Sequence, residues 1–375
     1  EGSGGTTTAT CMNVLAINGI GSVSPVIVDT PFLNATTCTG DVRFQNSANV
    51  IAVQDLISFG TGAVSLVSSG TGNLCLLGTI SSLNGDLTLT HGGDIAMVGH
   101  VQAITNDDNV LVQAGGNITL TGDGSVAPQI EGVFGGTSTV SVFAGNNIVG
   151  DGVADATQLD IVGENVSLRA GAIGRLGSCG KAAGRLEIHA GTLTITDAAG
   201  TGSGGLDAFL LQVGGGIDIE TVRVGSAFFL EVQDNLGAPD IRDTLSGSGI
   251  FACNVNLRAV GASSPATIGG GAGGALNVTG ATALDVRVNN NAGGNIAIAS
   301  SVCSSSIALM EITDAGLTLG PVGSITVAQT GAGDLQVNAA RAGNGTVTLT
   351  SAAGLILNGP VISGGGNNAA LTGAS

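Results

Sequence analysis

Hydrophobic and polar residues alternate in short runs along most of this chain. Clear examples are the runs Asp-Leu-Thr-Leu-Thr at 86–90, Asn-Ile-Thr-Leu-Thr at 117–121 and Thr-Val-Thr-Leu-Thr at 346–350. A period of two places Leu, Ile and Val on one face and Thr or Ser on the other, which is typical of strands with one buried face. No segment combines a helical period with capping residues. We therefore expect an all-β protein.

These runs come in pairs that are separated by a glycine step. Residues 110–114 pass through Gly115-Gly116 into the run at 117–121, and residues 186–190 pass through Gly191 into 192–196. A strand–turn–strand unit cannot bury its apolar face alone, so repeated copies must stack on one another. The pattern therefore predicts a β-solenoid.

The length of one coil follows from the spacing of the strands. Strand centres near Leu186, Leu210, Leu284, Leu309 and Leu335 lie about 24, 74, 25 and 26 residues apart, and the long interval is close to three shorter ones. A coil of about 25 residues with tolerated insertions explains these intervals. The 375 residues then correspond to roughly fifteen coils.

The composition agrees with a β-solenoid and limits what its surface can contact. Glycine numbers 65, aromatic residues make up 2%, and charged residues 10%, whereas soluble globular domains average about 25% charged residues. The mean hydropathy is +0.45. No run of about 18 apolar residues occurs, so we expect no membrane insertion. Either the solenoid has a core that is long relative to its girth, or its surface is buried in an assembly.

The chain is acidic, with a formal net charge of −17 and Lys181 as its single lysine. Such a surface repels phosphate backbones and anionic membranes, so we expect no nucleic-acid partner. Acidic, lysine-poor surfaces rich in Thr, Ser and Asn are common outside cells. The composition therefore favours an extracellular or cell-surface location.

Six cysteines are present, but no CxxC motif and no histidine lies near any of them in sequence, so metal-site spacing is absent. Cys11 and Cys38 lie about 27 residues apart, close to one coil, and neighbouring coils are about 4.8 Å apart. This spacing makes Cys11–Cys38 a candidate disulfide. The alternative is that small thiols simply pack well in stacked coils.

Three repeats carry a family resemblance: Gly-Asn-Ile-Thr-Leu-Thr-Gly at 116–122, Asn-Val-Ser-Leu-Arg-Ala-Gly at 165–171 and Gly-Asn-Ile-Ala-Ile-Ala at 294–299. They resemble the filamentous haemagglutinin-like repeats of large secreted bacterial adhesins, over roughly residues 60–365. The resemblance implies a right-handed parallel β-helix that is secreted, elongated, and adhesive or fibrous. Residues 1–55 show no match to the secretion module of that family.

An enzymatic β-helix needs clustered carboxylates with Arg or Lys, or a paired acid and base. The only adjacent acids are Asp107-Asp108, which we interpret as a polar turn, with a weak calcium site as the alternative. No motif gives His91, His100 or His189 a Ser or Cys partner, and we expect these histidines to point outward. We therefore expect no enzymatic activity, no cofactor and no metal.

Three of the ten basic residues, Arg175, Lys181 and Arg185, gather around Cys179. They could form a loop that docks on an acidic neighbouring subunit, or a solvated insertion loop.

We divide the chain into an amino-terminal strand, cap or joining segment at 1–55, solenoid repeats at 56–365 and a Gly/Asn-rich tail at 366–375. No capping helix is evident near either end, so each end exposes an edge that can pair with another chain. Our first hypothesis is a structural subunit of an extracellular filament or sheath that polymerises head to tail with copies of itself. The expected subunit contacts are Glu1, Gly2, Thr6, Thr7, Thr8 and Leu371 together with the three basic residues. The alternatives are a monomeric adhesin passenger domain that binds surface glycans or host proteins, and a carbohydrate-active enzyme.

Overall fold

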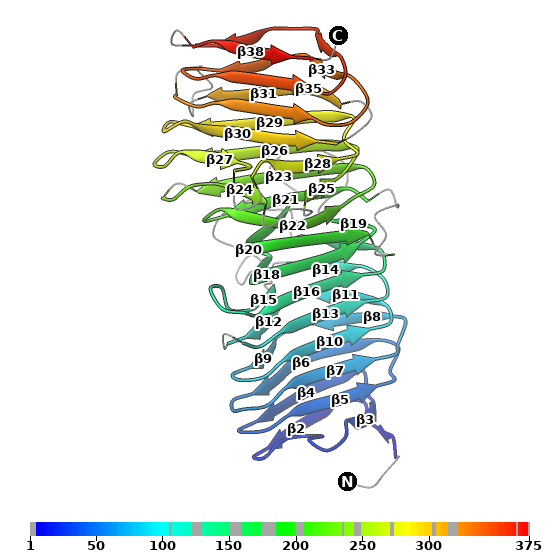
Figure 1. The fold of residues 1–375 in the computed structure, drawn as a ribbon. Helices are drawn as coiled ribbons and strands as arrows, with labels where there is room; N and C mark the ends of the chain where they lie inside the picture. The colour runs from blue at the N-terminus through cyan, green and yellow to red at the C-terminus, as the bar shows by residue number, and fades with distance from the viewer. Residues whose placement is uncertain are drawn as a thin grey trace. The chain divides into compact units, whose positions relative to one another are not determined.

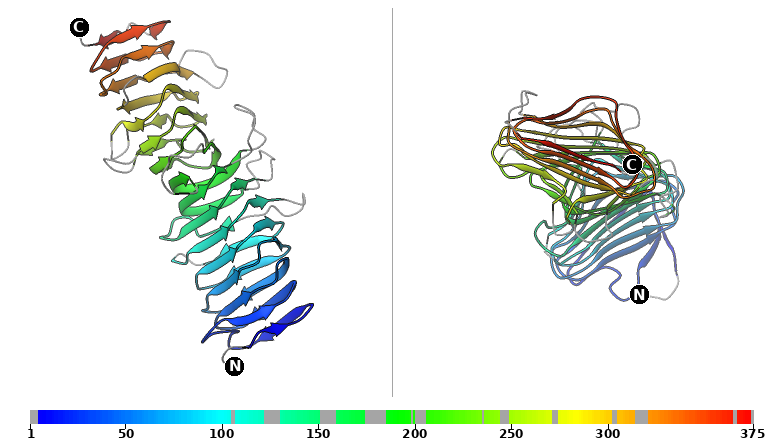
Figure 2. Two further views of the ribbon diagram at one scale, coloured as in Figure 1. Left: turned by 90° about the vertical axis from the view of Figure 1, so that its right-hand side faces the viewer. Right: turned by 45° about the horizontal axis from the view of Figure 1, so that its top comes forward.

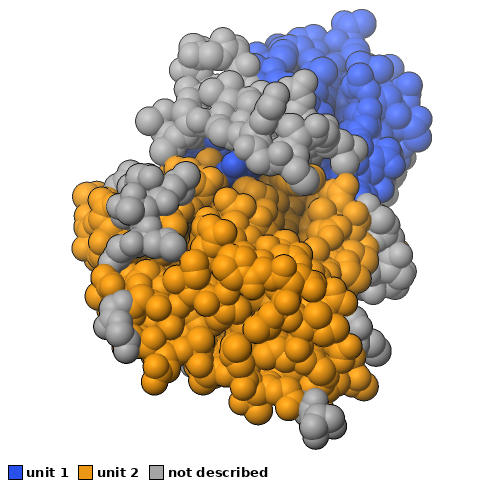
Figure 3. Space-filling view, turned by 90° about the horizontal axis from the view of Figure 1, so that it is seen from above, with its two compact units in different colours: residues 1–191 blue, residues 192–375 orange. Residues whose placement is uncertain are grey.

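A computed structural model describes residues 5–104, 107–121, 130–150, 159–173, 185–197, 199, 206–234, 236–243, 249–270, 274–301, 305–313, 321–364 and 367–373. The chain forms two compact units, residues Glu1–Gly191 and Thr192–Ser375, which Figure 3 distinguishes by colour. Each unit is described by itself below.

Both units are built from parallel strands that wind into a β-solenoid (Figures 1 and 2), and the chain completes about 13 turns. The predicted all-β solenoid is confirmed. The predicted count of roughly fifteen coils is slightly too high, because some coils are longer than expected. For example, Asn109 and Thr139 occupy neighbouring coils although they are 30 residues apart.

In unit 1, each coil contributes strands to as many as three parallel stacks. The first stack contains β1 (Thr7–Thr8), β3 (Val26–Asp29), β5 (Val42–Asn46), β7 (Val64–Ser68), β10 (Leu87–His91), β13 (Val110–Ala114), β16 (Thr139–Ala144) and β18 (Ile161–Ala170). The second stack begins with β2 (Met12–Ala16), β4 (Phe32–Thr37) and β6 (Ile51–Ser58). From β6 it divides into a branch of β8 (Asn73–Leu76), β11 (Asp94–Met97), β14 (Ile118–Leu120), β17 (Asn147–Val149) and β19 (Ala172–Ile173), and a branch of β9 (Thr79–Ser82), β12 (His100–Ala103) and β15 (Ile130–Glu131).

Unit 2 repeats this organisation, and the division between the units falls inside β20 (Leu186–Asp197). One stack contains β21 (Ala208–Val213), β23 (Ala227–Asp234), β26 (Asn254–Gly261), β29 (Ala283–Asn290) and β31 (Ser305–Thr313), and then divides into β33 (Leu335–Val337) with β36 (Leu355–Leu357) and β34 (Ala340–Ala342) with β37 (Val361–Ser363). The other stack begins with β22 (Ile217–Arg223) and divides into two branches, β24 (Ile241–Asp243) followed by β27 (Ala266–Ile268), and β25 (Gly249–Phe251) followed by β28 (Leu276–Thr279). Both branches rejoin at β30 (Gly294–Ser300), and the stack continues through β32 (Ile325–Gln329), β35 (Val347–Ser351) and β38 (Ala369–Thr372).

The period-two pattern sets the register of these stacks. In β10, Leu87 and Leu89 are buried, whereas Thr88 and Thr90 are not. Leu87 lies level with Val64 of β7 and Val110 of β13, so one apolar row continues through successive coils. Slipping a strand by one residue would turn its Leu and Val side chains outward, so burial of this row fixes the register.

Glycine and short polar residues form the corners between strands. The Asp94 Oδ1 accepts hydrogen bonds from the backbone nitrogen of Asn117, at 2.7 Å, and from its Nδ2, at 3.2 Å. One coil further on, Asn147 Nδ2 donates to Asn117 Oδ1 at 3.0 Å. These bonds link three consecutive coils at one corner.

Of the two segment boundaries predicted near the ends of the chain, the one at 55/56 lies within the stacks, and the one at 365/366 lies outside the described residues. The 55/56 boundary falls inside β6, which pairs with β4 on one side and with β8 and β9 on the other. The predicted tail at 366–375 contains β38, which pairs with β35.

Candidate functional site

The last coil of unit 2 exposes side chains whose level partners in the preceding coil are buried in the core. Figure 3 views the protein from above relative to Figure 1, with unit 2 in orange. Leu357 of β36 lies level with Val337 of β33, and Leu371 of β38 lies level with Leu349 of β35. Val337 and Leu349 are fully buried, whereas Leu357 and Leu371 are 44% and 43% exposed. The inward row therefore ends as an apolar surface.

The backbone of this coil is open as well. β33, β34 and β35 each pair on both sides, but β36, β37 and β38 pair on one side only within the described residues. The unpaired side of a strand presents N–H and C=O groups to which another strand can add. The last coil, the surface formed by β36, β37 and β38, is called the end coil below.

The sequence of the end coil contains no charged residue. The sequence after Arg341 contains no Asp, Glu, Lys or Arg, although the whole chain contains 37 such residues. Proteins commonly use charged residues on edge strands to prevent unwanted pairing. Within the described residues, the end coil therefore combines exposed apolar side chains with a strand edge that is unpaired and carries no charge of its own.

The first coil of unit 1 is similarly poor in charge, since no charged residue occurs between Gly2 and Val28. In its strand β2, Met12 lies level with the fully buried Leu33 but is itself only half-buried. β1 pairs within its own chain, where Thr7 lies level with Val28 and Thr8 with Asp29.

The structure separates the predicted subunit contacts into three groups. Thr6, Thr7 and Thr8 are exposed on the first coil, and Leu371 is exposed on the end coil. Arg185 is only 7% exposed, so its prediction as a docking side chain on a surface loop is wrong: it immediately precedes β20, where the chain has returned to the packed solenoid. Glu1, Gly2, Arg175 and Lys181 lie outside the described residues.

The predicted Cys11–Cys38 disulfide is wrong, because both cysteines are free and exposed. Met12 lies level with Leu33 and Ala16 with Thr37, so Cys11 precedes the paired strands and Cys38 follows them. Six residues along a strand separate these two levels by about 20 Å, far beyond the span of a disulfide. Level residues of β2 and β4 are 21 residues apart, whereas the two cysteines are 27 apart, so they occupy different positions within their coils.

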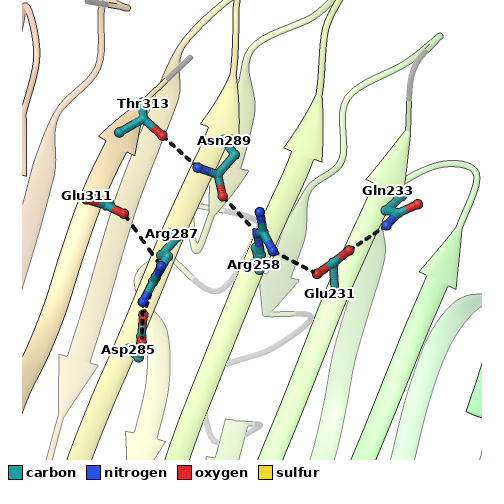
Figure 4. Close-up of polar contacts among 8 residues, drawn as sticks. All are labelled: Glu231, Gln233, Arg258, Asp285, Arg287, Asn289, Glu311 and Thr313. Atoms are coloured by element: carbon teal, nitrogen blue, oxygen red, sulfur yellow. Dashed lines mark hydrogen bonds and ion pairs between the residues drawn. The ribbon is translucent and has the colours of Figure 1, made fainter. Parts of the chain in front are cut away.

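A ladder of charged side chains crosses four coils of unit 2 (Figure 4). Glu231 of β23, Arg258 of β26, Arg287 of β29 and Glu311 of β31 lie level with one another and alternate with buried apolar positions. Sequence analysis missed this ladder. Its signal is an Arg or Glu at the same place within each hydrophobic run, which becomes visible only when the strands are aligned.

The side chains of this ladder mostly satisfy one another. Arg258 contacts Glu231 at 3.4 Å and donates from Nε to Asn289 Oδ1 at 2.9 Å, and Asn289 Nδ2 in turn donates to Thr313 at 2.6 Å. Arg287 holds both oxygens of Asp285, at 2.8 and 2.9 Å.

The hydrogen bond with Asp285 is the main cause that raises the pKa of Arg287 above its ordinary value, and Glu311 at 3.8 Å adds to it. This arrangement ties consecutive coils together on their outer face.

Three of the residues considered for catalysis or metal binding, His91, Asp107 and Asp108, make structural hydrogen bonds. His91 is buried rather than outward as expected, with Nε2 2.8 Å from the Gly72 carbonyl oxygen, because it occupies the inward row of β10. Asp107 accepts a hydrogen bond from Thr137 at 3.1 Å, and Asp108 from the backbone of Gly85 at 2.8 Å, so both serve as turn residues that link coils. Among the described residues, no group of three His, Cys, Asp or Glu side chains is placed to hold a metal ion.

No helix long and apolar enough to cross a membrane occurs in the described part of the chain. The chain matches no protein-family model, and neither the curated proteins nor the solved structures contain a match to it.

Proposed function

We propose that this protein is a structural β-solenoid, a subunit of an extracellular filament or sheath that grows when the end coil of one copy receives the first coil of the next. The observation that carries this proposal is the exposure of core-row side chains on an open, uncharged strand edge. A head-to-tail contact of this kind does not close on itself and therefore generates a filament.

Both surfaces suit such a contact. Parallel strands of a second copy that add to β36, β37 and β38 would extend the existing ladders by one coil, as β-augmentation does elsewhere. Burial of the exposed parts of Leu357 and Leu371 would contribute about 1 kcal/mol each. Neither surface brings like charges together, because the end coil has no charged residue and residues 2–28 have none.

The resemblance to adhesin repeats and the acidic, lysine-poor composition support an extracellular location as part of the same proposal. The charge ladder of unit 2 also fits a structural role, because its guanidinium groups are engaged by side chains of its own and neighbouring coils.

The test combines electron microscopy of the purified protein with light scattering over a range of concentrations. We expect long fibres of uniform width, whose growth is abolished in a Leu357→Asp/Leu371→Asp variant. The matched control is Leu236→Asp, which places the same charge at a leucine that is 93% exposed but lies outside the end coil. We expect this control to form fibres at the wild-type rate.

Two outcomes would overturn the proposal. One is a wild-type protein that remains a discrete particle at every concentration tested, which would favour the monomeric adhesin. The other is fibre growth that Leu236→Asp slows as much as the end-coil variant does, because the end coil would then have no special part in assembly.

A further inference from the structure

Five exposed residues, four of them large and apolar, form a straight row along one corner of unit 1. The row consists of Ile17, Cys38, Phe59, Leu83 and Ile104, and is called the corner stripe below. Ile17 is 71% exposed, Phe59 59%, Leu83 42% and Ile104 45%, and Cys38 is also exposed.

The register of the strands places these five residues in one row. Each of them directly follows the last residue of its strand, and the strands β2, β4, β6, β9 and β12 stack on one another (Figure 1). Those last residues are level with one another: Ala16, Thr37, Ser58, Ser82 and Ala103.

The last residues of four of these strands point into the core, since Thr37, Ser58, Ser82 and Ala103 are buried. Because side chains alternate along a strand, the next residue in every coil points outward. The backbone bonds continue past the strand ends, as in Phe59 N to Thr37 O at 3.1 Å and Ile104 N to Ser82 O at 3.1 Å. The four steps between these five coils, at about 4.8 Å each, give a row about 19 Å long.

The corner stripe is large for an exposed apolar surface. If a fully exposed large apolar side chain presents roughly 150–200 Å², the five residues together with the neighbouring Leu15 expose about 500 Å². This area lies toward the upper end of what monomeric proteins expose, and patches of that size usually mark a contact surface. Two stripes that cover each other would remove about 1,000 Å² from water, which reaches the lower limit for a specific interface.

The even spacing of the row favours a second copy of this chain as the partner. A straight row of evenly spaced side chains is complementary to itself when a twofold axis crosses its middle. With the axis at Phe59, Ile17 faces Ile104 of the second copy, and Cys38 faces its Leu83.

Charge and shape at the corner also permit this pairing. The residues that follow the row are small and uncharged, including Asn18-Gly19, Thr39-Gly40 and Asn84-Gly85. They let two backbones approach closely, and the acidic residues that come next, Asp41 and Asp86, are engaged within the chain by Arg43 at 2.8 Å and by the backbone nitrogen of Asn109 at 2.8 Å.

We propose that the corner stripe joins two copies side by side as an antiparallel pair about a twofold axis near Phe59. This lateral contact is separate from the end coil. Filaments with both contacts would associate laterally into ribbons or a sheath wall, whereas filaments with the end coil alone would remain single.

The experiment uses the full chain with Leu357→Asp/Leu371→Asp, so that growth at the end coil cannot obscure lateral pairing. Sedimentation equilibrium should show a dimer. Adding Phe59→Asp and Leu83→Asp should weaken this dimer by tenfold or more, with far-UV circular dichroism unchanged because both side chains are exposed. The control is Val67→Asp, which changes an outward apolar residue of β7 that is 42% exposed and lies off the stripe.

A second measurement tests the twofold geometry. Leu83→Cys should form a dimer linked through Cys38 of the second copy when a mild oxidant is added, and Cys38→Ser should abolish that link. Val67→Cys should give no such product.

The proposal is overturned if the end-coil variant sediments as a monomer at all concentrations, or if Phe59→Asp/Leu83→Asp leaves its dimer intact. It is also overturned if the chain stays monomeric and binds vesicles of neutral phospholipid in a way that depends on Phe59, because the stripe would then be a lipid-binding surface. Fibre growth of the wild-type chain at the end coil is unaffected by any of these results, so the two proposals fail separately.

Discussion

Replacing Gly115 by alanine tests the stacking of the coils directly. Gly115 lies at the corner between β13 and β14, in a column with Gly92 and Gly145 of the neighbouring coils. A Cβ on Gly115 would lie 2.1 Å from the Gly92 carbonyl oxygen, a distance that real Cβ atoms do not adopt. The φ of Gly115 lies outside the left-handed region, so the penalty comes from this contact and not from backbone conformation.

The magnitude follows from what must move. Relief of the contact requires the corner to separate by about 1 Å, which strains the bonds from Gly115 N to His91 O at 2.9 Å and from Gly116 N to Gly93 O at 3.0 Å. Each weakened bond costs about 1 kcal/mol, and overpacking adds about 1–3 kcal/mol. We therefore expect Gly115→Ala to lower the free energy of unfolding by about 3–5 kcal/mol.

Gly135→Ala is the matched control in the same unit. Gly135 has a φ of +88° but no atom within 4 Å of the added Cβ, so only the left-handed conformation is penalised, at about 1–2 kcal/mol. Urea denaturation followed by circular dichroism gives the free energies, and hydrogen exchange of peptides across 87–121 locates the loss, because repeat arrays need not unfold in one step. A Gly135→Ala variant that is destabilised as much as Gly115→Ala would refute the stacking argument.

Two further predictions concern the core and the cysteines. Leu257→Ala in β26 should cost about 2–5 kcal/mol in urea denaturation, since this side chain is fully buried between Leu230 and Val286, whereas the outward Val260→Ala should cost less than about 1 kcal/mol. Equal losses would show that β26 packs in a different register. Cys11, Cys38 and Cys253 should each react with a maleimide in the native protein without reductant, because all three are free and exposed. Peptide mass spectrometry that found Cys11 linked to Cys38 would contradict the register of β2 with β4.

The solenoid was predictable because its signal is local. Leu87 and Leu89 alternate with Thr88 and Thr90, and this alternation alone decides which side chains face the core. The repeated glycine steps then imply that the strands stack, since no single pair could bury its apolar face.

The positions of side chains within a coil were not predictable to the same degree. Coil lengths vary, so a separation close to one coil does not place two residues at the same level, as Cys11 and Cys38 demonstrate. The same uncertainty concealed the ladder from Glu231 to Glu311, whose members become neighbours only once each strand is in register.

The two open surfaces differ in how they could have been found. The absence of charge at the carboxyl end was visible in the sequence, and Leu371 was expected to be a contact, but the exposure of Leu357 required the structure. The corner stripe does leave a sequence signal, because an apolar residue or cysteine occurs directly before or close to a corner glycine in several successive coils, as at Ile17, Cys38 and Phe59. That signal can be interpreted only once the structure shows that these residues occupy the same corner of successive coils.

Three successive coil steps of unit 1, from Val42 to Val110, are nearly equal, so the number of coils in this stretch can change by whole units. Val42, Val64, Leu87 and Val110 occupy one row at steps of 22 or 23 residues, since paired groups in neighbouring coils are separated by these intervals. Excision of residues 64–86 would bring Leu87 against Val42 in an unchanged register, and a tandem duplication of the same stretch would insert one more turn. Unequal recombination in a gene of this kind can therefore lengthen or shorten the protein by about 4.8 Å at a time, without requiring a new core or a new fold.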